Sequence, residues 1–200
     1  MPGILSLFPP VVVQQFIEEN FPRPTINIHW LMKTCHAIES KHSLSPGMTE
    51  HITSFIRALE NTILHARWSD IMECGTGLPR FVGLKSMYTT LDKPVVLELV
   101  HLAEVGMSAF ALEKVRLERE QAIFSCFSRA SNAGQTVSLN ELSRLEDSLP
   151  DYPRNTLKLY LTDGVIELEA VELRHIPALD LGRSLMGLKV LAFDWKVFQL

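Results

Sequence analysis

The segment 157–177 predicts a β-hairpin and limits the fold more than any other part of the chain. Leucine occupies every second position from Leu157 to Leu161, which places the leucines on one face of a strand. Asp163 and Gly164 follow at once, and aspartate before glycine is typical of the tight turn that joins two antiparallel strands. The first strand and its turn are therefore predicted from local pattern alone.

The return strand is expected to run from Val165 to His175. Its apolar positions change phase near Ala170, after which Val171 and Leu173 become the apolar positions. A β-bulge near Ala170 would explain the change, because a bulge adds one residue to one strand of a pair. Since small closed barrels need bulged and strongly coiled strands, the pattern favours an OB-type β-barrel over a flat sheet.

Three amphipathic segments predict an N-terminal three-helix bundle over residues 9–75. Pro10 suits the start of the first helix, and Asn27 is the expected N-cap of the second. The third segment has the clearest helical spacing, and Ser45 and Pro46 mark its start. The fold class is therefore α+β, with the helical bundle followed by the OB-type barrel.

The remaining chain predicts a junction and a second domain. Residues 76–93 contain glycine and proline breaks and form the junction, and residues 94–200 form the OB-fold domain. An insertion at about 107–154 interrupts this domain. Its charged first half predicts a helix, and its second half, from Ser125, is expected to be mobile. Insertions this long inside a barrel are usually functional or disordered, so an insert without function stays the alternative.

Several segments, in this order, resemble one known family. They are Trp30–Leu31 with Cys35, Gly75–Pro79, Pro94–Leu99, Glu104–Phe110, Pro153–Arg154, Leu157–Gly164, Ala170–Pro177 and Gly187–Val190. Together they resemble the N-terminal helical and OB-fold regions of the RecQ-mediated genome instability protein 1 family. The chain departs from this family at Leu185–Lys189, where a Pro-Pro-Gly-Thr-Lys turn is usual. Its C-terminal end is expected to be truncated, with the last barrel strand missing.

This resemblance implies a nuclear, noncatalytic scaffold that joins a type IA topoisomerase III and a RecQ-family helicase in double Holliday junction dissolution. It implies contact with DNA mainly through that complex. The insertion is implied to contact the topoisomerase. Carried over by position, the candidate contact residues are Phe110, Leu112, Val115, Ile123, Phe124 and Phe127. Packing of these side chains against the barrel is the alternative.

Catalytic motifs are not found in the sequence. It has no glycine-rich phosphate loop, no nucleophile elbow and no paired Cys or His motif, so we expect no enzymatic activity, no cofactor and no metal. His101 with Glu104 is the nearest approach to an acid/base pair. Asp163 is better explained, with Gly164, as a structural turn.

The cysteines and the apolar runs of the sequence predict neither disulfides nor a membrane span. Cys35, Cys74 and Cys126 are odd in number and widely spaced, so buried free thiols are expected rather than disulfides. No apolar run approaches the roughly 18 residues that a membrane span needs. We therefore expect no membrane partner.

The alternative function is a stand-alone OB-fold protein that binds single-stranded nucleic acid. Such binding needs a cationic groove with exposed aromatic rings. The hairpin instead carries Glu167, Glu169 and Glu172, which are expected on a solvated strand face, and the whole chain has a formal net charge of -4. Because such a surface repels phosphate, the sequence favours a platform for protein partners.

Overall fold

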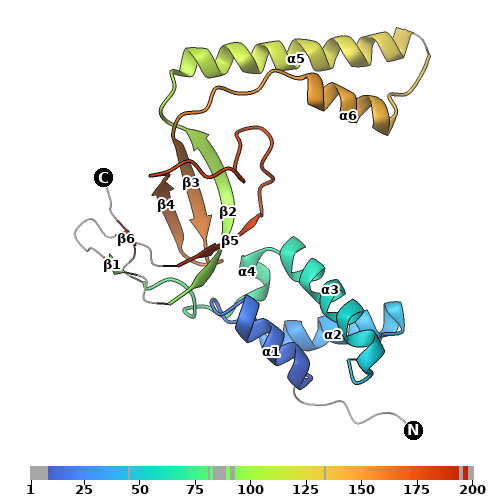
Figure 1. The fold of residues 1–200 in the computed structure, drawn as a ribbon, viewed down its shortest axis with the longest axis vertical. Coiled ribbons are helices and arrows are strands. Elements are labelled where there is room, and N and C mark those ends of the chain that lie inside the picture. Colours follow the sequence, from blue (N-terminus) through green and yellow to red (C-terminus); the bar gives the residue numbers. More distant parts are fainter. Residues whose placement is uncertain are drawn as a thin grey trace. The chain divides into compact units, whose positions relative to one another are not determined.

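The structure is a computed structural model. It describes residues 9–44, 46–80, 82, 89–90, 93–132, 134–193 and 196–197. These residues form helices and a four-stranded antiparallel sheet (Figure 1). The chain divides into two compact units, and each is described by itself. The first comprises residues 1–101, 159–170 and 185–200, and the second comprises residues 102–158 and 171–184.

The helices of the first unit follow the predicted segments and add one short helix. They are α1 (Val11–Asn20), α2 (Ile28–His42), α3 (Thr49–His65) and α4 (Trp68–Ile71). The Asn27 side chain caps α2 by accepting hydrogen bonds from the backbone N–H groups of His29 at 3.0 Å and Trp30 at 3.1 Å, which confirms the predicted cap. Ser45, the predicted start of the third helix, lies outside the described residues, and α3 begins at Thr49.

The core of the first unit is built from the apolar faces of these helices. α2 and α3 pack together, and α1 packs on α3. The fully buried members include Val13 from α1, Phe55, Leu59 and Ile63 from α3, and Trp68 from α4. The sequence pattern did not predict α4, because four residues are too few to show helical spacing.

The main sheet has the strand order β4-β3-β2-β5. Its strands are β2 (Val95–Glu104), β3 (Leu157–Thr162), β4 (Glu167–Val171) and β5 (Lys189–Ala192). β2 pairs antiparallel with β5, so that Val95 lies opposite Ala192 and Glu98 lies opposite Lys189. Two short strands, β1 (Thr89–Thr90) and β6 (Lys196–Val197), pair in a second small sheet.

The hairpin turn is longer than the sequence predicted. β4 begins at Glu167 instead of Val165, and Gly164 adopts a left-handed φ of +98° that glycine tolerates. The Asp163 Oδ1 atom accepts hydrogen bonds from the N–H groups of Val165 at 2.9 Å and Ile166 at 2.7 Å. The carboxylate therefore organises the turn from inside, as aspartate does in Asx-turns.

The predicted phase change after Ala170 has a different cause. β4 ends at Val171, and Leu173 is 90% exposed. Val171 is 39% exposed, so neither residue is an inward-facing residue of a bulged strand. The inward alternation instead continues from Leu168 to the buried Glu172, whose N–H group donates to the Leu157 carbonyl at 2.9 Å.

Asp163 also connects the turn to the Gly75–Pro79 run. Its Oδ2 atom accepts a hydrogen bond from the N–H group of Leu78 at 2.6 Å, across 85 positions of sequence. Gly77 must be glycine here, because a Cβ atom at that position would lie 2.4 Å from Asp163 Oδ2. The packing of this carboxylate explains why glycine precedes Leu78.

Leu161→Ala tests the buried face of β3 in the first unit. Leu161 is fully buried, so truncation should lower the free energy of unfolding by about 2–5 kcal/mol through lost burial and a residual cavity. Urea unfolding followed by circular dichroism measures this loss. Leu139→Ala is the matched control, because Leu139 is 84% exposed. A loss at Leu161 no larger than at Leu139 would place this strand face outside the core.

All three cysteines are free thiols, but only Cys35 is buried. Cys74 is exposed and Cys126 is half-buried, so the expectation that all three are buried is wrong for these two. Burial, and then the neighbouring Glu39 carboxylate, raise the pKa of the Cys35 thiol to about 11. Among the described residues, no helix is both long enough and apolar enough to cross a membrane.

Candidate protein-binding surface

The insertion of the second unit contains two helices, α5 (Ala109–Asn132) and α6 (Leu139–Ser148) (Figure 1). The Ser108 hydroxyl accepts a hydrogen bond from the Ala111 N–H group at 3.2 Å at the start of α5. α6 begins with a capping box between Ser138 and Glu141. The half of the insertion that was expected to be mobile is thus largely helical, because α5 continues past Ser125 and a second cap starts α6.

One face of α5 contacts the chain that returns from α6. Its half-buried residues recur every three or four positions at Ala111, Val115, Arg119, Ala122, Cys126 and Ala130. Arg119 donates a hydrogen bond to the Pro150 carbonyl at 2.8 Å, and its guanidinium lies 5.2 Å from the centre of the Tyr152 ring. This face of α5 is therefore the packed face.

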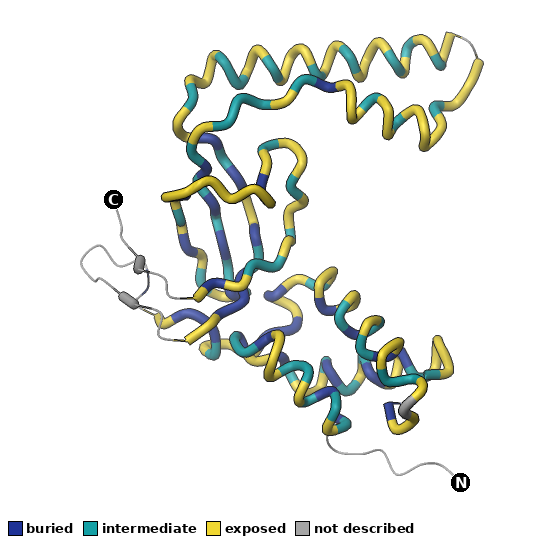
Figure 2. The backbone as a smooth tube through the Cα atoms, viewed as in Figure 1, coloured by how far each residue is buried: buried dark blue, intermediate teal, exposed yellow. Residues whose placement is uncertain are grey.

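The opposite face of α5 carries three apolar side chains at intervals of seven residues. Phe110 is 81% exposed, Leu117 is 44% exposed and Phe124 is 72% exposed. Seven residues complete nearly two turns of an α-helix, so these side chains lie in line, about 10.5 Å apart along the axis. α5 is exposed or half-buried along its whole length (Figure 2). We call Phe110, Leu117 and Phe124 the apolar stripe.

The charges beside the apolar stripe are paired with one another. Arg116 lies 2.8 Å from Glu113 and 3.1 Å from Glu120, and the hydrogen bond from Arg116 holds the pKa of Glu113 below its usual range. Lys114 and Glu118 form a weaker pair at 4.0 Å. Exposed pairs of this kind add little stability. They do leave the rim of the stripe with little unpaired charge, which suits an apolar interface with a polar rim.

The six residues implied by the resemblance do not share one face. Phe110 and Phe124 belong to the apolar stripe, and Phe127, three positions after Phe124, lies beside it at 48% exposed. Ile123 is 39% exposed and lies about 100° around the helix from Phe124, between the stripe and the packed face. Leu112 and Val115 are half-buried on the other side of the helix. The binding role of all six stays a prediction. Leu117 was missed, although its seven-residue spacing from both phenylalanines was a signal that could have identified it.

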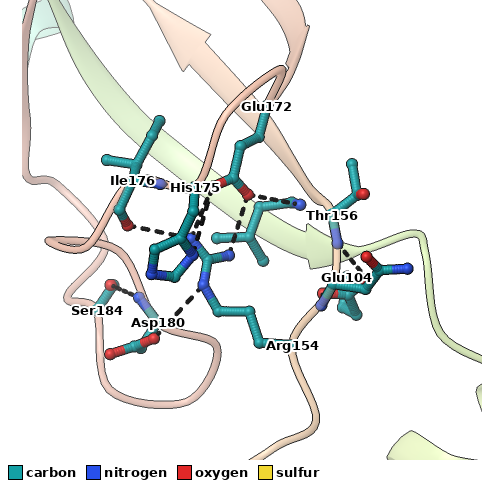
Figure 3. A network of polar contacts seen from close by, with 10 residues as sticks. Glu104, Arg154, Thr156, Glu172, His175, Ile176, Asp180 and Ser184 are labelled. Atoms are coloured by element: carbon teal, nitrogen blue, oxygen red, sulfur yellow. Dashed lines mark hydrogen bonds and ion pairs between the residues drawn. The ribbon is translucent and has the colours of Figure 1, made fainter.

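Buried carboxylates hold the base of the insertion in the second unit (Figure 3). Glu104, at the end of β2, accepts hydrogen bonds from the N–H groups of Gly106 at 2.6 Å, Asn155 at 2.8 Å and Thr156 at 3.0 Å. Burial alone would raise the pKa of Glu104, but these three donors outweigh it and lower the pKa. The carboxylate is fully engaged with backbone, which argues against an acid/base role with His101.

Glu172 forms the second buried centre. Its carboxylate accepts two hydrogen bonds from Arg154, at 2.9 and 3.1 Å, and one each from the N–H groups of Leu157 at 3.0 Å and Ile176 at 2.5 Å. His175 Nδ1 lies 3.9 Å from the same carboxylate, and Arg154 Nε lies 3.7 Å from Asp180. Glu172 is therefore a buried ion-pair partner, and the expectation that it lies on a solvated strand face is wrong. Glu167 and Glu169 are exposed.

Glu172→Gln should remove much of the acid sensitivity of the second unit. Burial raises the pKa of Glu172, but the bonds from Leu157, Ile176 and Arg154 outweigh it, so the folded pKa lies below the unfolded one. The resulting stability is present above the unfolded pKa, near 4.5, and is lost as the pH falls through the folded value. The variant should lose roughly 1–3 kcal/mol at neutral pH, because Arg154 loses a charged partner.

Thermal melts between about pH 7 and pH 3 measure this effect. Glu169→Gln is the control, because Glu169 lies on β4, three residues before Glu172, and is exposed. Equal acid sensitivity in the wild type and in Glu172→Gln would show that this carboxylate does not stabilise the folded state.

Two comparisons with known proteins bear on this chain. A family model described as "RMI1, N-terminal OB-fold domain" matches residues 78–198, which is more than half of the chain. The matched range contains all the described strands and both helices of the insertion. No curated protein matches the sequence significantly.

Proposed function

Since the chain belongs to the RMI1 family through its N-terminal OB-fold domain, we propose that it is a noncatalytic scaffold subunit. In this proposal it joins a type IA topoisomerase III to a RecQ-family helicase in the nucleus. The assembly would dissolve double Holliday junctions, and the chain would meet DNA mainly through its partners. The apolar stripe on α5 is the proposed contact with the topoisomerase.

The observation that carries this proposal is the exposure of the stripe. Large apolar side chains in line on the outward face of a helix are typical of helices that lay anchors into a partner's groove. Two of the three anchors are aromatic, and binding energy concentrates in a few such residues. The packed face of α5 already contacts Pro150 and Tyr152, so the outward face is the one available to a partner.

Single-stranded nucleic acid fits this surface less well. Phenylalanine rings can stack on bases, but that mode also needs cationic side chains that are free to meet phosphate. Beside the stripe, Arg116 pairs with two glutamates and Lys114 pairs with Glu118. On β4 the exposed charges include Glu167 and Glu169. A protein partner is therefore favoured.

Calorimetry with the topoisomerase III of the same organism tests the proposal. An apolar interface should hold its affinity within about threefold between low and physiological salt, because it releases few counterions. A single-stranded oligonucleotide would instead lose affinity steeply over the same range. Binding to the oligonucleotide without binding to the topoisomerase would replace the proposed function with the alternative.

A further inference from the structure

The insertion leaves the sheet and returns to it at two adjacent points, which we call its roots: Val105–Gly106 on the way out and Asn155–Thr156 on the way back. Glu104 is 8% exposed and lies just before the first root. Its Oε1 atom accepts from Gly106 and from Thr156, and its Oε2 atom accepts from Asn155. One carboxylate thus holds the departing and the returning chain together.

The two roots also touch each other directly. The Val105 N–H group donates to the Thr156 carbonyl at 2.9 Å, and Asn155 Nδ2 donates to the Gly106 carbonyl at 3.2 Å. A Cβ atom at Gly106 would lie 2.6 Å from Asn155 Nδ2. Only a residue without a side chain can therefore bring the roots this close.

The insertion depends on its base because its helices have little core of their own. Neither α5 nor α6 contains a fully buried residue. α5 begins at Ala109, only three positions after Gly106, whose N–H group is bound by the Glu104 carboxylate. The position of Gly106 therefore determines the direction in which α5 starts. A binding element whose base is loose must be ordered when the partner binds, and that ordering lowers affinity.

We propose that Glu104 is a positioning residue for the partner-binding surface: it ties the two roots together and so presents the apolar stripe in a binding-ready arrangement. The proposal rests on the proposed function and assigns to this buried carboxylate a role in partner binding. Glu104 itself does not contact the partner in this account. It acts through the backbone N–H groups that it holds.

Glu104→Gln is the direct test, with Glu141→Gln as the matched control. Glutamine replaces one carboxylate oxygen by an NH2 group, which is itself a donor and cannot accept a hydrogen bond from a backbone N–H group. It therefore cannot replace a carboxylate whose two oxygens accept three N–H bonds. Glu141 also accepts a backbone N–H bond, from Ser138 at 2.8 Å, but it caps α6 and does not join the roots. We expect Glu104→Gln to weaken topoisomerase binding about tenfold and Glu141→Gln to change it less than about twofold.

Amide hydrogen exchange provides the readout that is independent of the partner. Exchange at Gly106, Asn155 and Thr156 should accelerate in Glu104→Gln and stay unchanged in Glu141→Gln. Accelerated exchange with unchanged affinity would overturn the proposal, because the roots would then be loose without consequence for binding. Unchanged exchange would overturn it too, since the carboxylate would not be what holds the roots.

Gly106→Ala is a second variant that keeps every carboxylate and decides the matter if Glu104→Gln fails to fold. Its added methyl group should push Asn155 away and weaken binding by a similar factor. Unchanged binding would overturn the proposal.

A Phe110→Ala/Phe124→Ala variant in the same assay separates the role of Glu104 from the proposed function on which it rests. If this variant loses affinity while the root variants do not, only the role of Glu104 fails; if the wild type does not bind, the proposed function fails and the exchange data still report on the roots.

Discussion

Trp68→Ala is expected to lower the free energy of unfolding by about 3–5 kcal/mol, because it removes a large buried aromatic side chain from the core of the first unit. Trp68 is fully buried. Its indole Nε1 donates a hydrogen bond to the Val96 carbonyl at 2.8 Å, and its ring meets the Phe21 ring edge-on at a centroid distance of 6.1 Å. The substitution therefore leaves a cavity and an unpaired carbonyl together.

The loss extends to a buried ion pair beside the ring. The Lys189 ammonium lies 4.5 Å from the Trp68 ring centre and 2.9 Å from Glu98 Oε2, and its side chain is 3% exposed. The backbone N–H group of Trp68 donates to the same Glu98 oxygen at 2.7 Å. Without the indole ring, the ammonium loses its cation–π contact in a site where water cannot easily replace it.

Trp30→Ala is the matched control, because Trp30 is only half-buried on α2. Urea unfolding followed by tryptophan fluorescence and circular dichroism compares the two variants. If Trp68→Ala lost no more stability than Trp30→Ala, the contacts of α4 with β2 and β5 would not be a major source of stability.

The second large effect is expected in binding. Replacing Phe110, Leu117 and Phe124 together by alanine should weaken topoisomerase binding at least about 100-fold, because anchors of this kind contribute most of the energy of an interface. The fold should be preserved, since all three side chains are exposed and none belongs to the buried core. Calorimetry measures the affinity, and circular dichroism checks the helix content.

The control for this experiment replaces three exposed leucines outside the apolar stripe by alanine. Leu139, Leu173 and Leu185 are each at least 79% exposed and lie outside α5. Their triple alanine variant should bind almost as tightly as the wild type. Equal losses in the two variants would show that the stripe is not a specific site, and no loss in either would move the interface to another surface.

Several local predictions agree with the structure because short-range patterns determine them. The alternation of leucines from Leu157 to Leu161 produced a strand with those residues buried. Asn27 caps the second helix through its own side chain. These features depend on neighbours within four residues, and the sequence displays such neighbours directly.

The errors came where the chain leaves regular structure. The phase change near Ala170 was interpreted as a bulge, but the strand ends there and Leu173 is exposed. Glycine, serine and asparagine after Ser125 suggested mobility, but the Ser138 capping box starts another helix. Where a strand ends, and whether a weak helix forms, depends on which of its side chains pack against distant parts of the chain. A local sequence pattern does not contain that information.

By itself, the sequence determined the α+β class, the main helices, the hairpin and the family. Only the tertiary structure decided the roles of the carboxylates. Asp163 meets Leu78 across 85 positions, and Glu104 meets Thr156 across 52. Glutamate in a solvated strand and glutamate in a buried site look the same in sequence. Burial costs a carboxylate its water, so the difference depends on whether distant backbone donors converge on it, and that is a property of the folded chain.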